Sequence, residues 1–260
     1  EHLHYGYWTE DLPVNLMNLP KAQQNYSDFL RSQIPPSVKT ILDVGGGVGK
    51  FAWQLQQKGY QVDVVSPSSV FSERARTLLG EKSEIFDCKF EDMTTAKHYD
   101  LILFSESFQY IPLPALFDKL PELLSPGSCV LVSDFFKTAV HGDDQPGDRS
   151  FGGGHGLAAF YDCLAQSPFE LLRDDDITAR VSPTIELLDD WLVNRLAPAA
   201  GTLDDYLLDN YPRLTRLFKW LLRHRLARLR YKYLAGNRSR AVFEKYKSYR
   251  LLVLRLTPGV

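Results

Sequence analysis

The chain has 260 residues, of which 44% are hydrophobic and 24% are charged, and its formal net charge is -2. This is the composition of a globular protein with a full core, and it excludes a disordered chain. Three widely spaced cysteines exclude a disulfide scaffold, and no apolar run reaches the roughly 18 residues of a membrane span. Without a disulfide framework we expect a reducing, cytoplasmic setting. No group of His and Cys has zinc-ligand spacing, so we expect no metal site.

Charge is distributed unevenly along the chain. From Arg213 to Arg255 there are fourteen Lys or Arg and one acidic residue, Glu244, while sixteen basic and thirty-one acidic residues lie elsewhere. A basic segment of this kind indicates an anionic partner. It could be a helix with solvated arginines, or a surface for an anionic or membrane-held substrate. Nucleic acid is not expected, because no known nucleic-acid-binding motif accompanies the segment.

The first half of the chain predicts an alternation of strands and helices. Residues 1–36 read as an aromatic arm followed by a helix from Pro20 to Gln33, which ends before two prolines. After it come predicted strands at 40–44, 60–65, 84–90, 100–104 and 128–133, and predicted helices at 50–58, 70–79 and 113–124. Such alternation is typical of a parallel sheet whose ligands bind at the carboxyl ends of its strands.

The pattern changes after Asp134. A loop at 140–156, a helix at 157–166, a strand at 169–172, a helical stretch at 184–234 and a strand at 248–256 are predicted. We therefore expect an α/β fold with a Rossmann-like, seven-stranded, mostly parallel sheet and helices on both faces. Three parts are predicted: an N-terminal arm and helix (1–36), a cofactor-binding domain (37–183 and 246–260) and a helical cap over the substrate (184–245).

The strongest motif follows the first predicted strand. One acidic residue precedes four glycines in it: Asp43, then Gly45, Gly46, Gly47 and Gly49. Glycines let the backbone turn tightly and approach a ligand closely. A dinucleotide fingerprint would also need glycine at position 50, which is Lys. The spacing instead resembles motif I of the class I S-adenosylmethionine-dependent methyltransferases. This resemblance implies that S-adenosyl-L-methionine is the cofactor, with its methionine half on the glycine loop.

Two further segments are similar to that family. Residues 100–111 look like its fourth strand and the loop after it, and residues 124–134 look like its fifth strand. The resemblance implies that Ser105 and Glu106 contact the cofactor. It also implies that the residues after the third strand hold the adenine, with Phe90 against the base and Glu91 or Asp92 accepting from its amine.

One position departs from the family pattern. The family ends its second strand with an acidic residue that chelates the ribose hydroxyls, but this chain has Ser66 there. A serine makes one such hydrogen bond, not a bidentate contact. Asp63 is three residues too early and should point elsewhere. This leaves open an alternative: a non-methylating member of the same fold, either a catalyst of another reaction or a partner-binding subunit.

The N-terminal arm carries the motif His4-Tyr-Gly-Tyr-Trp8. It resembles the arm of the cyclopropane-fatty-acid-synthase, tocopherol and sterol methyltransferase group, in which the arm folds over the cofactor. The resemblance implies that Tyr5, Tyr7 and Trp8 contact the cofactor, since aromatic ring faces attract cations such as a sulfonium. Packing of the arm for stability alone is the other interpretation.

Methyl transfer to oxygen usually needs a proton acceptor. His155, in a glycine-rich loop past the fifth strand, is the first candidate because imidazole titrates near neutral pH, and His141 is the second. We expect Tyr110, Phe218 and Tyr231 to line the acceptor pocket. The aromatic residues Phe218, Trp220, Tyr231 and Tyr233 predict a small, largely apolar acceptor, such as a lipid, a terpenoid or a polyketide-like secondary metabolite. Methylation of oxygen or nitrogen is favoured over methylation of carbon.

Overall fold

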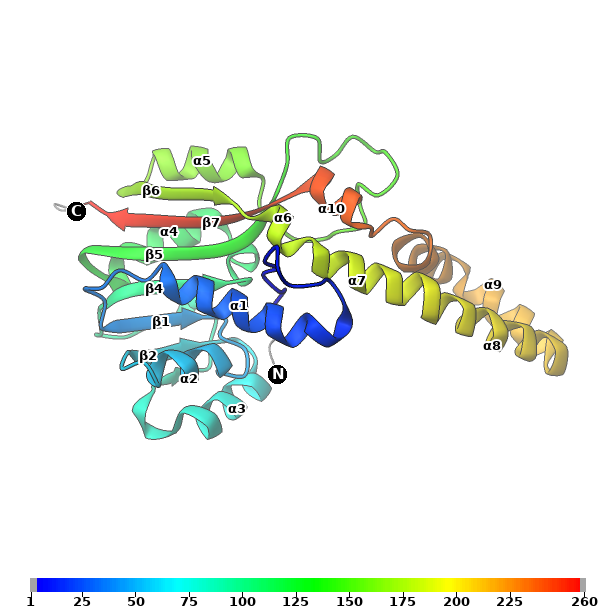
Figure 1. The fold of residues 1–260 in the computed structure, drawn as a ribbon, viewed down its shortest axis with the longest axis horizontal. Coiled ribbons are helices and arrows are strands. Elements are labelled where there is room, and N and C mark those ends of the chain that lie inside the picture. The colour runs from blue at the N-terminus through cyan, green and yellow to red at the C-terminus, as the bar shows by residue number, and fades with distance from the viewer. Residues whose placement is uncertain (1–3, 258–260) are drawn as a thin grey trace.

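The computed structural model describes residues 4–257. Its strands are β1 (Thr40–Val44), β2 (Gln61–Val65), β3 (Ile85–Phe86), β4 (Tyr99–Ser105), β5 (Leu124–Lys137), β6 (Phe169–Asp176) and β7 (Lys247–Leu256). They form one sheet in the order β3-β2-β1-β4-β5-β7-β6, in which β7 alone runs antiparallel to its neighbours (Figure 1). The predicted seven-stranded, mostly parallel sheet is confirmed.

The sheet register brings the carboxyl ends of the central strands together. Val44 at the end of β1 is paired with Val65 of β2 and with Phe104 of β4, and Phe104 is paired with Val132 of β5. Residues that follow these strands therefore emerge at one edge of the sheet. Ligands of open parallel sheets bind at such an edge.

Helices cover both faces of the sheet. On one face lie α1 (Leu19–Ser32), α2 (Lys50–Gln56) and α3 (Ser69–Leu79), and on the other lie α4 (Leu113–Leu123) and α5 (Leu157–Ala165). A hydrophobic core lies on each face of the sheet, and neighbouring strand residues alternate between the two cores. Ile41 packs with the first set of helices and Leu42 with the second. Both side chains are fully buried, as expected for a strand at the centre of the sheet.

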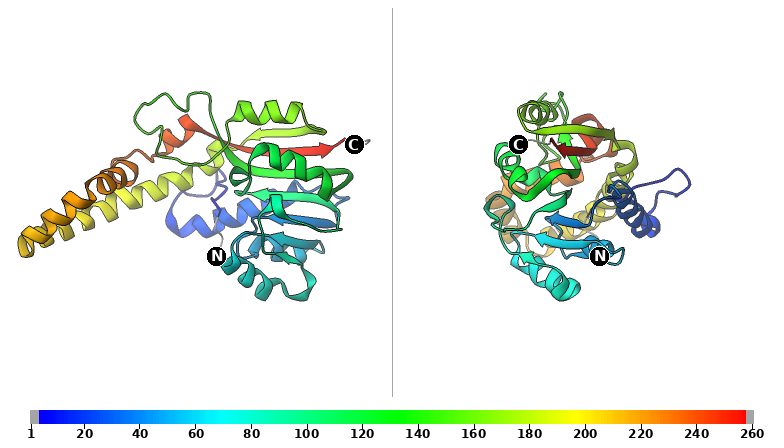
Figure 2. Two further views of the ribbon diagram at one scale, coloured as in Figure 1. Left: turned by 180° about the vertical axis from the view of Figure 1, so that it is seen from behind. Right: turned by 90° about the vertical axis from the view of Figure 1, so that its left-hand side faces the viewer.

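A helical insertion separates β6 from β7. It contains α6 (Thr178–Val181), α7 (Pro183–Trp191), α8 (Ala197–Asn210), α9 (Pro212–Leu229) and α10 (Arg240–Tyr246). Here α8 and α9 form a hairpin that projects from the body of the protein, rather than a lid closed over it (Figures 1 and 2). Within residues 4–257, no helix is both long and apolar enough to cross a membrane.

Several element boundaries differ from the sequence prediction. Only two residues of the predicted third strand pair with β2, and Phe90 instead begins a short 3-10 turn. The fifth strand runs on to Lys137 because β7 pairs along its whole end, up to Lys247. The sixth strand continues to Asp176 for the same reason, since β7 pairs with it as far as Arg250.

Candidate cofactor and acceptor site

The loop between β1 and α2 needs its glycines. Gly45, Gly47 and Gly49 have φ angles of 72°, 55° and 80°, in the left-handed region that favours glycine. A Cβ on Gly45 would lie 2.5 Å from the Cβ of Ser107. A Cβ on Gly46 would lie 2.6 Å from Oδ2 of Asp43. Larger residues at these positions would therefore be incompatible with the backbone conformation of the loop.

A cavity of about 280 Å³ lies against this loop. Seven of the predicted site residues line it: Asp43, Gly45, Gly46, Gly47, Ser105, Glu106 and Tyr110. Five lining residues were not predicted: His4, Val48, Lys50, Phe51 and Phe71. Of these, Val48 lies within the glycine motif, and Lys50 and Phe51 directly follow it, so their position in the sequence was a usable signal. Nothing in the sequence pointed to Phe71, which lies in α3.

Asp43 places a carboxyl group on the lining of the cavity. Its side chain is buried, and within the described part of the chain its Oδ2 atom has no hydrogen-bond partner. Burial raises the pKa of Asp43 to about 7. A buried carboxylate without a partner is unfavourable, so this geometry fits a ligand that brings positive charge or hydrogen-bond donors.

Glu106 places a second carboxyl group on the same cavity. It follows β4 with a φ of 59°, which is strained for a residue other than glycine and is typical of functional sites. Its Oε1 accepts hydrogen bonds from the Tyr5 backbone N–H (2.9 Å) and from the Tyr249 hydroxyl (2.8 Å). Burial, with a smaller contribution from the nearby Asp134, raises the pKa of Glu106 to about 8.

The N-terminal arm reaches the cavity through His4 and through its backbone. The His4 ring stacks on Tyr26 with centroids 4.4 Å apart, and His4 lines the cavity. The Tyr5 ring packs edge-on against Phe243 and Tyr249 at 6.3 Å, away from the cavity lining. The arm is therefore attached to the cavity at Glu106 by the main chain of Tyr5, not by its phenol.

Tyr7 and Trp8 pack elsewhere. The Tyr7 ring stacks on Phe29 of α1 with centroids 4.5 Å apart. The Trp8 ring is buried, and its Nε1 donates to Oγ1 of Thr184 in α7 at 2.9 Å. Neither residue lines the cavity. For these two residues the geometry agrees with the second interpretation, in which the arm packs for stability.

The residues expected at the ribose and adenine do not line the cavity. Ser66 is buried, and its Oγ accepts from the Ser68 backbone N–H at 3.3 Å. Phe90 is 3% exposed and packs against Phe104 in the core, with centroids 5.5 Å apart. Three further predicted residues also lie outside the lining: Gly49, Glu91 and Asp92. Gly49 packs on α3, because a Cβ on Gly49 would lie 3.2 Å from Ala75 of that helix.

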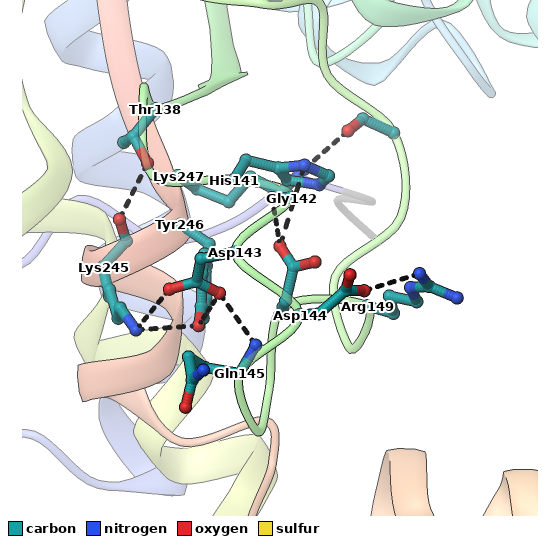
Figure 3. A network of polar contacts seen from close by, with 12 residues as sticks. Thr138, His141, Gly142, Asp143, Asp144, Gln145, Arg149, Lys245, Tyr246 and Lys247 are labelled. Atoms are coloured by element: carbon teal, nitrogen blue, oxygen red, sulfur yellow. Dashed lines mark hydrogen bonds and ion pairs between the residues drawn. The ribbon is translucent and has the colours of Figure 1, made fainter.

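The two candidate bases lie outside the cavity lining. His155 is half-buried, with Nε2 3.2 Å from the Phe108 carbonyl oxygen, and burial lowers its pKa. Burial also lowers the pKa of His141, whose Nδ1 is 3.7 Å from Oδ1 of Asp148. Figure 3 shows His141 beside the contacts that join its loop to α10, including that of Asp143 with Lys245.

Asp134, near the end of β5, was not predicted as a site residue. It is fully buried, and Oδ2 and Oδ1 accept from the backbone N–H and side-chain amide of Gln109, both at 3.0 Å. Burial raises its pKa to about 7. Its position at the carboxyl end of a predicted strand was the signal that could have identified it. Asp134 fixes the loop between Glu106 and Tyr110.

Two predicted acceptor residues stand on the helical insertion, away from the cavity lining. Phe218 in α9 is 54% exposed. Tyr231 follows α9, and its hydroxyl accepts from the Gly147 backbone N–H at 3.0 Å. Tyr110 does line the cavity and is strongly exposed. The structure thus brings Tyr110 to the cavity but leaves Phe218 and Tyr231 on the helical insertion.

The glycine-loop cavity lies at the edge of the sheet where open α/β sheets bind their ligands, and comparison with known proteins identifies the family. The model of the methyltransferase domain family matches residues 19–172, and the chain belongs to this family. It is an S-adenosylmethionine-dependent methyltransferase. None of the curated proteins compared matches it.

Solved structures share its fold at low identity. Geranyl diphosphate C-methyltransferase from Streptomyces coelicolor A3(2) is 16% identical, with 99% of this chain and 90% of that chain covered and a TM-score of 0.70. StiE O-MT is 15% identical, with coverage of 100% and 88% and a TM-score of 0.69. The cyclase SpnF is 18% identical, with coverage of 99% and 88% and a TM-score of 0.67.

Proposed function

We propose that this enzyme methylates an oxygen or nitrogen atom of a small, largely apolar acceptor, such as a lipid, a terpenoid or a polyketide-like natural product. The observation that carries the proposal is the set of aromatic side chains that line the cavity beside Glu106: His4, Phe51, Phe71 and Tyr110. Tyr110 is also strongly exposed, so it stands where the cavity meets solvent. An acceptor that enters beside Glu106 would therefore meet aromatic surface.

The cavity residues suit the two charges of an amino-acid group. Asp43 and Glu106 are the proposed partners of the cofactor's ammonium, and Lys50, which lines the same cavity, is the proposed partner of its carboxylate. S-adenosylmethionine, when bound, supplies a methyl group already activated by its sulfonium sulfur. The chain's own contribution is to hold this cofactor, align the acceptor and exclude water.

His155 is the proposed proton acceptor. Because its pKa is lowered, its imidazole is neutral at physiological pH, as a general base requires. Gly153 and Gly154 directly precede it with φ angles of 73° and 78°, so this loop has a backbone conformation that residues other than glycine rarely adopt. The loop would have to move for the ring to reach the cavity, and exchange between loop conformations is common in enzymes of this kind.

A methyl-transfer assay tests the proposal. The chain is incubated with S-adenosylmethionine labelled in its methyl group and with a panel of apolar alcohols, phenols and amines. We expect label on at least one acceptor, and a lower rate for His155→Asn than for His141→Asn. Cofactor binding without label in any product would refute methyl transfer to this class of acceptor. It would favour the non-methylating alternative, to which Ser66 at the ribose position points.

A further inference from the structure

The α8–α9 hairpin exposes an unusual amount of apolar surface. Eight large apolar side chains on its two helices are each more than half exposed: Leu203, Tyr206, Leu214, Leu217, Phe218, Trp220, Leu221 and Leu229. A groove of about 370 Å³ between the two helices is also lined mainly by apolar side chains, including Leu207 and Leu214. Soluble monomers rarely expose contiguous apolar patches of this kind, so a partner surface is indicated.

The charge on α9 limits what that partner can be. From Arg213 to Lys232 the chain has eight Lys or Arg and no acidic residue. Among the salt bridges of the described residues, the only one that involves this segment joins Lys219 to Asp204 of α8, with Nζ and Oδ2 2.5 Å apart. The remaining basic side chains are available to an anionic surface.

Apolar and basic positions alternate along α9 as in an interfacial helix. Leu214, Leu217, Leu221 and other apolar residues recur at intervals of three and four, with basic residues such as Arg216 and Arg223 between them. Helices of this composition lie in the plane of a lipid bilayer, with leucine and aromatic side chains in the acyl boundary and basic groups near the phosphates. Long basic side chains can reach the phosphates while their stems stay in apolar surroundings.

The helix that leads into the hairpin, α7, is anchored beside the cofactor cavity. Oγ1 of Thr184, in α7, accepts from the Gly6 backbone N–H (3.1 Å) and from Trp8 Nε1 (2.9 Å), and the neighbouring Tyr5 N–H binds Glu106 in the cavity. The hairpin extends from the same end of the sheet as the carboxyl ends of β1 and β4 (Figure 1). A surface that binds α9 would therefore lie at the end of the protein where the acceptor enters.

We propose that α9, with the apolar face of its hairpin, docks on an anionic lipid bilayer and lies in its interface without crossing it. Two copies of this chain that met through α9 would bring like charges together, and a nucleic acid would leave the leucines and Phe218 exposed. The bilayer satisfies both the apolar and the basic groups. Docking requires no turnover, so it can hold or fail independently of the proposed function.

Vesicle flotation tests the docking with the full chain. We expect the chain to float with phosphatidylcholine vesicles that contain phosphatidylglycerol, and much less with phosphatidylcholine alone or in high salt. Reversing three charges, R223E/R225E/R228E, should weaken partitioning by about a hundredfold or more. The matched control K58E/K82E/K89E makes the same charge change on exposed residues outside the hairpin and should float like the parent.

A second pair of variants tests the apolar contribution. L217S/L221S should reduce flotation, whereas Val70→Ser, at a residue that is 61% exposed on α3, should not. Circular dichroism and thermal unfolding show whether each variant is folded. No flotation of the parent chain at low salt would overturn the proposal, as would flotation that survives both hairpin variants. A stable dimer that L217S/L221S dissociates, without vesicle binding, would assign the surface to a second copy instead.

Discussion

Replacing Asp43 with asparagine should stabilise the cofactor-free chain and weaken cofactor binding together. Burial raises the pKa of Asp43 from 3.8 to about 7, so the folded chain favours the protonated form. Between these two pH values the folded state holds more protons than the unfolded state, and stability falls as the pH rises. The cost of the ionised form at pH 8 is about 4 kcal/mol.

Asparagine removes this cost because it carries no charge. Its buried amide still lacks a hydrogen-bond partner at the position of Oδ2, which lowers the unfolding free energy by about 1–3 kcal/mol. We therefore expect Asp43→Asn to gain about 1–3 kcal/mol of unfolding free energy at pH 8 and to gain nothing at pH 4. Urea unfolding at the two pH values measures the difference.

Cofactor affinity should change in the opposite direction. With a pKa of about 7, Asp43 is about one tenth ionised at pH 6 and about nine tenths ionised at pH 8. If its carboxylate meets the cofactor's positive charge, the parent chain binds S-adenosylmethionine about tenfold more tightly at pH 8, while Asp43→Asn shows a smaller change. Isothermal titration calorimetry measures both.

The control is Asp100→Asn at the opposite edge of the sheet. Hydrogen bonds from the Thr40 and Lys39 backbones lower the pKa of Asp100 despite its partial burial, so its stabilising effect is lost as the pH falls. This variant should lose stability at neutral pH and keep its cofactor affinity. Equal affinity of the parent at pH 6 and pH 8, with unchanged affinity in Asp43→Asn, would refute the reasoning.

Three further variants test the surroundings of the cavity. Gly45→Ala puts a Cβ into a clash at a φ of 72° and should abolish cofactor binding in calorimetry. The control Gly59→Ala, at a φ of 93° in open space, should lower the unfolding free energy by about 1 kcal/mol and leave cofactor affinity intact. Equal cofactor affinities of the two variants would contradict this. Thr184→Val leaves two donors of the N-terminal arm without their acceptor and should lower the unfolding free energy by about 2–4 kcal/mol, with faster hydrogen exchange at residues 5–8. Unchanged exchange there would count against this anchoring role. Tyr249→Phe removes a hydrogen bond that lowers the pKa of Glu106, so the rise of cofactor affinity with pH should move to higher pH. An unchanged pH dependence of the affinity would show that this hydroxyl does not affect the ionisation of Glu106.

The first half of the fold followed directly from the sequence. The strand at 40–44 was predicted with the correct bounds, because its run of apolar residues ends at a glycine-rich turn. Gly45, the first residue of that turn, has a positive φ, which ends the extended backbone. Asp43, Ser105 and Glu106 were placed at one cavity edge for a related reason. Each lies at or just after the carboxyl end of a parallel strand, and those ends share an edge.

The remainder depended on contacts distant in sequence. Asp174, Asp175 and Asp176 have poor strand propensity, yet they extend β6 because β7 pairs beside them. Arg250 of β7 forms ion pairs with Asp174 and Asp176, which compensate part of their charge. Likewise, the apolar period at 214–229 predicts a helix but does not say what covers it; Phe218, assigned to the acceptor pocket, lines the groove between α8 and α9 and not the glycine-loop cavity.

The position of β7 has a consequence for synthesis of the protein. Among residues 4–257, this strand separates β5 from β6 and is the only sheet neighbour of β6, yet it is made after the entire helical insertion. A nascent chain that has just completed β6 therefore holds that strand unpaired, together with the bare edge of β5, until residues 247–256 emerge. Unpaired strand edges recruit other chains, so the interval between these two strands is when the growing polypeptide is most exposed to misassembly and most in need of a chaperone.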